Sequence, residues 1–222
     1  MLGHRFYFKT LRKYKSIFGT LFDAVVIERT DPNSNTVDLI KVPLKLAGKE
    51  KVLARLRDDP NIDKKTAITL PVMSFELTGM SYDEDRKLIS TNRTAQKIVD
   101  DPNHMYAQYT PVPYNFFFSL YIYVKFAEDA AKIVETILPF FKPDYTVTAN
   151  MIEELDLEVR DVPIIMLGQP QIQDIYEETF VERQVQMWTL NFVLKGHIWG
   201  PVEKKPIIKF VDVSQWILDN NE

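Results

Sequence analysis

Apolar and polar side chains alternate most regularly at residues 114–126, where the sequence reads YNFFFSLYIYVKF. Alternation of this kind places every second side chain on one face of a β-strand. At ~3.3 Å per residue, the segment predicts a strand of about 43 Å, which is longer than one small sheet requires. The apolar parity consists of Tyr114, Phe116, Phe118, Leu120, Ile122, Val124 and Phe126.

Further β-strands are expected on both sides of this segment. Two β-branched runs, 24–29 and 37–44, flank a turn-rich loop and predict a hairpin, and Pro43 should end its second strand or lie on an edge. In a later run the apolar parity changes near Met187 and Trp188, which predicts a bulge or a passage between sheet layers. The remaining expected strands are a half-buried one at 71–79 and those at 145–151, 162–168, 181–199 and 206–213.

Three segments have the apolar spacing of helices. Residues 49–58 form a short amphipathic helix, and 127–141 form one that begins with acidic residues and pairs Glu128 with Lys132 at i,i+4. Residues 5–22 carry an apolar stripe opposite a basic side, and we expect the stripe to face the core. The stripe consists of Tyr7, Leu11, Tyr14, Phe18 and Leu21, and the basic side of Arg5, Lys9, Arg12 and Lys13.

These elements predict an α+β fold of long, mainly antiparallel β-strands packed with about three helices, including an N-terminal amphipathic helix. Nothing rich in Gly, Pro and Ser divides the chain, so we expect a single domain over residues 1–222. Residues 81–113 are polar and turn-rich. A connection of roughly 30 residues is too long for a plain loop, so we expect a long interaction segment there.

Composition leaves little inventory for catalysis. The 222 residues include no cysteine, three histidines and seven glycines. This excludes disulfides, thiol nucleophiles and Cys-ligated metal sites, and it disfavours Gly-rich phosphate loops. We interpret the acid clusters at 83–85, 153–156 and 177–178 as solvated charge runs, because they lack the spacing of an oxygen-ligand metal loop. We therefore expect no catalytic residue, no metal and no cofactor, and a small carboxylate hydrolase is a distant alternative.

Charge is unevenly distributed along a chain whose formal net charge is −4. Residues 1–60 hold twelve Lys and Arg against seven Asp and Glu, so the acidic excess lies in the remainder. The basic side of the first helix is either a solvated face or a partner-binding surface. Its aromatic residues lie on the opposite side, which argues against nucleic-acid stacking. The charged start and the short apolar run at 116–124 predict neither a signal peptide nor a membrane span, and we expect a reducing cytosol.

Read in order, five segments resemble the tail completion and sheath stabiliser proteins of large contractile-tailed bacteriophages. No single motif is diagnostic, but the order and spacing of the segments cover roughly residues 1–202. The segments are GTLFDAVVIER (19–29), KVPLKLAGKEKVLARL (41–56), LPVMSFELTGMSYD (70–83), QYTPVPYNFFFSLYIYVKFAEDAAKIVETILPFFKP (108–143) and RQVQMWTLNFVLKGHIWGPV (183–202).

The resemblance implies a structural virion protein and not an enzyme. It implies a hexameric ring in the neck region at the head-proximal end of the tail. There the ring would contact the tail terminator, the last ring of the tail sheath protein and the neck or head-completion proteins. DNA would pass only as cargo, through a lumen that we expect the acidic excess to line in part. Assembly would take place in the cytoplasm of the bacterial host.

We expect the strand at 114–126 and the segment 81–113 to form the ring. A tail terminator or head–tail adaptor is an alternative role within the same machine. Loss of the protein would distinguish the two roles, because shed sheaths fit the first and overlong tubes fit the second. The candidate interface residues are Arg5, Lys9, Arg12, Lys13, Tyr106, Tyr109, Tyr121, Tyr123, His197 and Trp199.

Overall fold

A computed structural model describes residues 6–30, 37–57, 70–98, 101–152, 159–175 and 185–211. Contacts within the chain divide it into two units. The larger unit comprises residues 7–87 and 112–198, and the smaller unit residues 1–6, 88–111 and 199–222. The larger unit contains α1 (Thr10–Phe22), β1 (Val26–Thr30), β2 (Val37–Lys41), β3 (Leu44–Leu46), α2 (Lys49–Arg57), β4 (Val72–Tyr82), β7 (Val112–Val124), α3 (Ala127–Ile137), a 3-10 turn (Leu138–Phe140), β8 (Asp144–Asn150), β9 (Val159–Ile175) and β10 (Val185–Ile198), and the smaller unit contains β5 (Arg93–Ile98), β6 (Asp101–Tyr109) and β11 (Glu203–Pro206).

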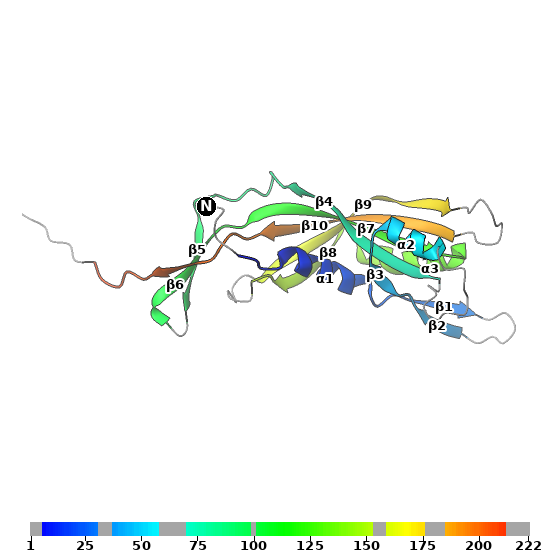
Figure 1. Ribbon diagram of the computed structural model, residues 1–222, viewed down its shortest axis with the longest axis horizontal. Helices are drawn as coiled ribbons and strands as arrows, with labels where there is room; N and C mark the ends of the chain where they lie inside the picture. The colour runs from blue at the N-terminus through cyan, green and yellow to red at the C-terminus, as the bar shows by residue number, and fades with distance from the viewer. Residues whose placement is uncertain are drawn as a thin grey trace, which may run out of the picture. The chain divides into compact units, whose positions relative to one another are not determined.

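A six-stranded sheet organises the larger unit, in the order β3-β4-β7-β10-β9-β8. Every neighbouring pair is antiparallel except β3 and β4, which run parallel. The long strands lie side by side along the unit (Figure 1). With three α-helices among the described residues, this arrangement confirms the α+β prediction.

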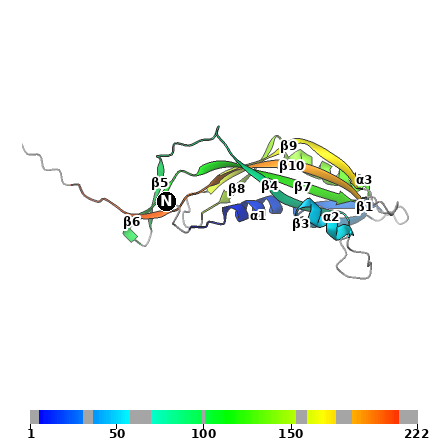
Figure 2. The ribbon, with the colours of Figure 1, turned by 45° about the horizontal axis from the view of Figure 1, so that its top comes forward.

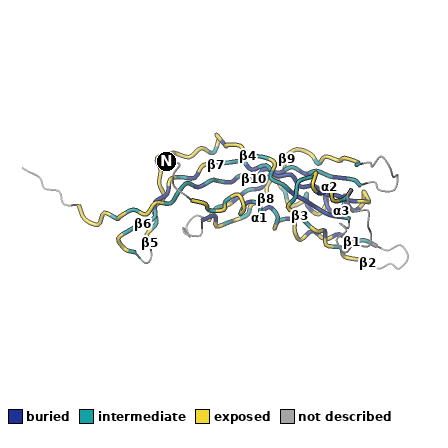
Figure 3. The backbone as a smooth tube through the Cα atoms, in the orientation of Figure 1, coloured by how far each residue is buried: buried dark blue, intermediate teal, exposed yellow. Residues whose placement is uncertain are grey.

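Both faces of the central strands are covered. On one face, Phe18 of α1 stacks on Phe118 of β7 at 4.5 Å between ring centroids and also meets Phe192 of β10 at 5.5 Å. On the other face, Tyr121 and Tyr123 form a cluster with Val52 of α2, Val72 and Met187. Figure 2 shows α1 lying along the sheet, and Figure 3 shows the buried residues gathered on the middle strands. Both parities of β7 are therefore buried from Phe118 to Val124.

Coverage by α2 also explains the parity change in β10. Met187 faces the α2 cluster, whereas Leu190 and Phe192 have the opposite parity and are buried as well. The pairing with β9 changes register between Thr189 and Asn191, which confirms the predicted irregularity. The same two-sided burial corrects the expectation for β4, because Val72–Phe75 are buried on both parities instead of half-buried.

Helix α1 begins five residues later than predicted. Lys9 precedes it with φ 55°, in the left-handed region that stops a right-handed helix from extending backwards. Tyr7 and Leu11, expected in the core stripe, are 75% and 39% exposed. The buried residues of the helix are Tyr14, Phe18 and Phe22, spaced four apart.

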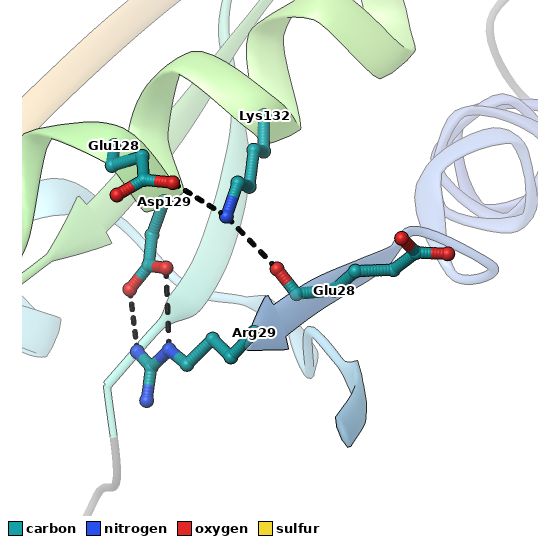
Figure 4. A network of polar contacts seen from close by, with 5 residues as sticks. All are labelled: Glu28, Arg29, Glu128, Asp129 and Lys132. Carbon is teal, nitrogen blue, oxygen red and sulfur yellow. Dashed lines mark hydrogen bonds and ion pairs between the residues drawn. The ribbon is translucent and has the colours of Figure 1, made fainter. Parts of the chain in front are cut away.

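The predicted hairpin is present as β1 and β2, paired antiparallel from Val26↔Lys41 to Thr30↔Val37. A polar network joins it to α3 (Figure 4). The guanidinium of Arg29 makes a two-pronged ion pair with the carboxylate of Asp129, whose side chain is 5% exposed. Lys132 donates to the carbonyl of Glu28 (3.0 Å) and pairs with Glu128 (2.8 Å), as its i,i+4 spacing predicts.

The smaller unit has a three-stranded sheet in the order β11-β6-β5. Strands β5 and β6 form an antiparallel hairpin within residues 81–113, so that segment contains regular structure. The predicted strand at 206–213 is wrong in position. Strand β11 ends at Pro206, residues 207–211 form no strand, and 212–213 lie outside the described residues.

Candidate interaction surfaces

The basic side of α1 is only partly a free surface. Lys9 and Arg12 are exposed, whereas Lys13 is half-buried and its ammonium donates a hydrogen bond to the carbonyl of Met151 (3.1 Å). Arg5, the fourth predicted basic residue, lies outside the described residues. Because Met151 is fully buried, Lys13 ties the helix to the segment after β8, and the charge available to a partner comes from the other positions.

A hollow of about 770 Å³ lies between α1, β3 and β4. Its apolar lining combines the exposed side chains of Tyr7, Leu11 and Leu46 with the buried ring of Phe75. Arg12 and Lys15 also line it. An acidic residue, Asp23, belongs to the same lining, but its carboxylate already pairs with Lys41 (3.1 Å). The hollow thus combines apolar surface with uncompensated positive charge.

The sequence does not predict this hollow, because the spacing of Tyr7 and Leu11 places them in the core stripe. Helical periodicity shows which side chains share a side of a helix, but it does not show how far the covering sheet extends. Only the structure shows that α1 starts at Thr10, so that Tyr7 precedes the first helical turn.

In the smaller unit, the predicted tyrosines occupy a polar sheet surface. Tyr109 is 43% exposed, and the guanidinium of Arg93 lies 4.4 Å from the centre of its ring. Tyr106 is half-buried and pairs with Lys204 across the β6–β11 ladder. Tyr109 therefore presents an aromatic surface, and the guanidinium of Arg93 packs against one face of its ring.

Beside these tyrosines, Asp101 accepts contacts from two basic groups. Lys204 lies 2.7 Å away and the Nδ1 atom of His104 lies 2.8 Å away. Lys204 first, and then His104, hold the pKa of Asp101 well below its usual range. The carboxylate therefore stays ionised and fastens β11 to the start of β6.

The candidate residues Tyr121 and Tyr123 pack in the core of the larger unit, with exposed fractions of 8% and 0%. The hydroxyl of Tyr121 donates to the carboxylate of Glu76 (2.8 Å), and that of Tyr123 to the carbonyl of Lys49 (3.4 Å). Burial and the nearby Glu76 raise the pKa of Tyr121 to about 12. Strand β7 itself is paired with β4 and β10 along both edges, so its backbone has no free edge to offer another subunit.

His197 and Trp199 lie at the end of β10 and just beyond it. The backbone amide of His197 donates to the hydroxyl of Tyr14 (2.7 Å), which in turn donates to the carbonyl of the same residue (2.9 Å). Trp199 is 2% exposed. In the chain by itself, the backbone of His197 anchors α1 to the sheet and the Trp199 side chain is buried.

The acid clusters divide by position. Asp83, interpreted from sequence as solvated, is 7% exposed and pairs with Arg86 at 2.6 Å, so that interpretation is wrong for this residue. Arg86 also donates to the carbonyl of Tyr114 (3.2 Å), which secures the turn after β4. The hydrogen bond from the Arg86 side chain, and then its charge, lowers the pKa of Asp83. The clusters at 153–156 and 177–178 lie outside the described residues.

Within the described part of the chain, no three His, Cys, Asp or Glu side chains gather as a metal site would require. Among the same residues, no helix has the length and apolar character needed to cross a membrane. The described residues present three exposed features: the hollow beside α1, the sheet of the smaller unit and the residues that follow β11.

Two comparisons with known proteins agree. The family model described as T4-like virus Myoviridae tail sheath stabiliser matches residues 5–221. The tail completion protein gp15 of Enterobacteria phage T4 is 27% identical over 212 residues, which cover 91% of this chain and 75% of that protein.

Proposed function

The chain belongs to the T4-like Myoviridae tail sheath stabiliser family, and from this premise we propose that it assembles as a hexameric ring at the head-proximal end of a contractile tail. The family assignment confirms the resemblance drawn from the sequence and makes the chain a structural protein of the phage tail. The match over residues 5–221 carries the proposal, since it spans both units of the fold.

In this proposal the ring caps the sheath and tube. It contacts the tail terminator and the last ring of sheath protein on one side and the neck or head-completion proteins on the other. It assembles in the bacterial cytoplasm, contains no enzymatic centre and lets DNA pass as cargo. Identical subunits close a ring when one patch on each binds a different patch on the next, so the chain needs two complementary surfaces.

The segments predicted to form the ring contribute unequally to this proposal. Strand β7 has no free edge and its side chains are mostly buried, so we assign it to the core. The β5–β6 hairpin within 81–113 exposes Tyr109, and Ile89, which precedes the hairpin, is exposed as well. The segment 81–113 remains a candidate contact. The basic residues of α1 remain a candidate partner surface.

Tails produced without this protein test the role. We expect tubes of normal length whose sheaths detach or contract, because the last sheath ring would have nothing to hold it. Electron microscopy of negatively stained lysates measures both tube length and sheath occupancy. Overlong tubes would instead assign the chain to tail termination. Native mass spectrometry of the purified protein tests the hexamer separately, and a protein that stays monomeric at all concentrations and does not join tails contradicts the ring.

A further inference from the structure

The residues after β11 form an exposed apolar arm, defined here as residues 207–211. Ile208, Phe210 and Val211 are 81%, 92% and 76% exposed. The base of the arm is held in place, because the amide of Ile207 donates to the carbonyl of Asn103 (2.9 Å) and Lys209 donates to the Asn103 side chain (2.6 Å). The arm therefore leaves the sheet of the smaller unit from a fixed point.

Three large apolar side chains exposed within four residues are uncommon in a chain that acts alone. Single exposed apolar residues are ordinary, but contiguous ones mark contacts with another surface. The arm is rich in β-branched and aromatic residues, which are common in strands, and the sequence predicts a strand at 206–213. The pattern fits an extended segment that is buried by a partner.

The hollow beside α1 has the size and lining to receive such a segment. Its volume of about 770 Å³ falls in the range of roughly 300–1,000 Å³ that is typical of ligand pockets, which is enough for several side chains of a docked segment. The buried ring of Phe75 lines it, and Tyr7, Leu11 and Leu46 add exposed apolar surface to the same lining. An aromatic and a branched aliphatic side chain would bury this surface together with their own.

Charge favours the same pairing. Arg12 and Lys15 line the hollow, and its one acidic residue, Asp23, is already paired with Lys41. In the sequence, residues 207–222 contain three acidic side chains, Asp212, Asp219 and Glu222, against the single basic side chain of Lys209, whose ammonium already donates to the Asn103 side chain. An arm that enters the hollow would therefore bring the acidic residues that follow it toward a positive rim, which favours association and fixes its direction.

We propose that the arm of one copy docks in the α1–β3–β4 hollow of the neighbouring copy. The inference rests on the proposed ring and names the contact that closes it. Arm and hollow are different patches of the same chain, so the contact is heterologous and propagates around a ring. Each copy gives one arm and accepts one, which leaves no arm and no hollow unoccupied after closure.

Cysteine pairing tests this contact without background, because the chain has no cysteine of its own. Two single variants, Phe210→Cys and Leu46→Cys, are mixed, allowed to assemble and treated with a mild oxidant. Mass spectrometry then identifies the disulfide that joins them. The matched control replaces Leu46→Cys with Leu39→Cys, which lies on β2 with a similar exposure, 69% against 60%, and does not line the hollow. We expect the 210–46 disulfide to exceed the 210–39 disulfide at least tenfold, because docking raises the effective concentration of the two thiols.

The double variant Phe210→Cys/Leu46→Cys distinguishes exchange between copies from an arm that folds back on its own chain. Exchange gives a ladder of linked chains on a non-reducing denaturing gel. A disulfide confined to single chains overturns the inference. A hexamer, measured by native mass, in which the 210–46 disulfide does not exceed the control also overturns it, while the proposed ring stands. A monomer without the disulfide contradicts both.

A second variant measures the contribution of the arm to assembly. Phe210→Ser should raise the dissociation constant of the ring by about tenfold or more, since one fully buried aromatic side chain is worth that much in affinity. Leu39→Ser is the control, because Leu39 is similarly apolar, 69% exposed and outside both arm and hollow. Equal weakening by the two substitutions would overturn the inference. Both positions are exposed, so neither variant should lose its fold.

Discussion

At the scale of single residues, Gly196 shows how closely α1 approaches the sheet. A Cβ built at this position would lie 2.5 Å from the Tyr14 ring and 2.8 Å from the Phe116 ring, and both rings are buried. We expect Gly196→Ala to lower the free energy of unfolding by about 1–3 kcal/mol through overpacking. Chemical denaturation measures the change. Gly200→Ala is the control, because nothing lies within 4 Å of its Cβ; an equal loss there would refute the packing argument.

Tyr14 gives a second prediction at this scale, with a dependence on pH. Its hydroxyl bonds to both backbone groups of His197, so Tyr14→Phe should cost about 1–3 kcal/mol by leaving them unsatisfied. Burial raises the pKa of Tyr14 from 10.0 to about 12. Its contribution to stability is therefore complete below pH 10 and is lost as the pH rises through 12, because the unfolded chain releases the proton first.

Denaturation at pH 8 and pH 11 measures this alkaline loss in the native chain and in Tyr14→Phe. The variant should lose less stability between pH 8 and pH 11 than the native chain. Part of the loss should remain in the variant, because the pKa of Tyr121 is also raised to about 12. Tyr7→Phe, which removes a hydroxyl from a 75% exposed side chain, should match the native chain. An unchanged alkaline loss in Tyr14→Phe would show that the buried hydroxyl does not contribute.

At the scale of elements, the network of Figure 4 fastens the β1–β2 hairpin to α3. Asp129→Ala should lower the free energy of unfolding by about 1–3 kcal/mol, since Arg29 loses a charged hydrogen-bond partner but remains 35% exposed and can reach water. Glu128→Ala, at the neighbouring position with a 77% exposed side chain, should change it by less than about 0.5 kcal/mol. Similar losses in both variants would mean that the Arg29–Asp129 ion pair adds nothing to stability beyond the change in helix propensity.

The success of sequence analysis also varies by element. The hairpin at 24–44, strand β7 and the Glu128–Lys132 pair follow from local periodicity, and the structure contains them. Periodicity failed where burial depends on a distant element. Val72–Phe75 are buried on both parities because α1 covers one face and α2 the other, and no local pattern reports that.

Local periodicity also misplaced candidate surface residues, since some residues predicted to be exposed are buried and some predicted to be buried are exposed. The sequence predicts Tyr121 and Tyr123 as interface residues, but α2 covers their face of β7. Tyr7 and Leu11 were assigned to the core, but the sheet does not cover that end of α1. Residues 207–211 have the composition of a strand. Their backbone bonds to β6 at Ile207, whose amide donates to the carbonyl of Asn103, and they form no strand.

At the scale of the whole molecule, the two units differ in how much core they possess. Among the described residues of the smaller unit, the buried hydrophobic side chains are Ala107 and Trp199. A three-stranded sheet with so little buried apolar surface is marginal alone. We therefore propose that the chain folds as the single domain expected from its sequence, and that calorimetry will show one transition with equal calorimetric and van't Hoff enthalpies. Two resolved transitions would establish independent units.

The uneven charge of the chain leads to the last prediction. The acidic excess after residue 60 should partly line the lumen of the proposed ring, where it repels the phosphate backbone and lets DNA pass without adhering. The purified ring should then bind duplex DNA no more tightly than a dissociation constant of ~10⁻⁴ M at physiological salt, the weak limit of non-specific binding.

Fluorescence anisotropy with a labelled duplex, measured over a series of salt concentrations, tests this prediction. Arg12→Glu is the companion variant: if the exposed basic residues of α1 face protein partners and not the lumen, the substitution should leave DNA affinity unchanged while weakening assembly into tails. Micromolar binding with a steep salt dependence, abolished by Arg12→Glu, would instead place the basic side of α1 in the channel and overturn the acidic lumen.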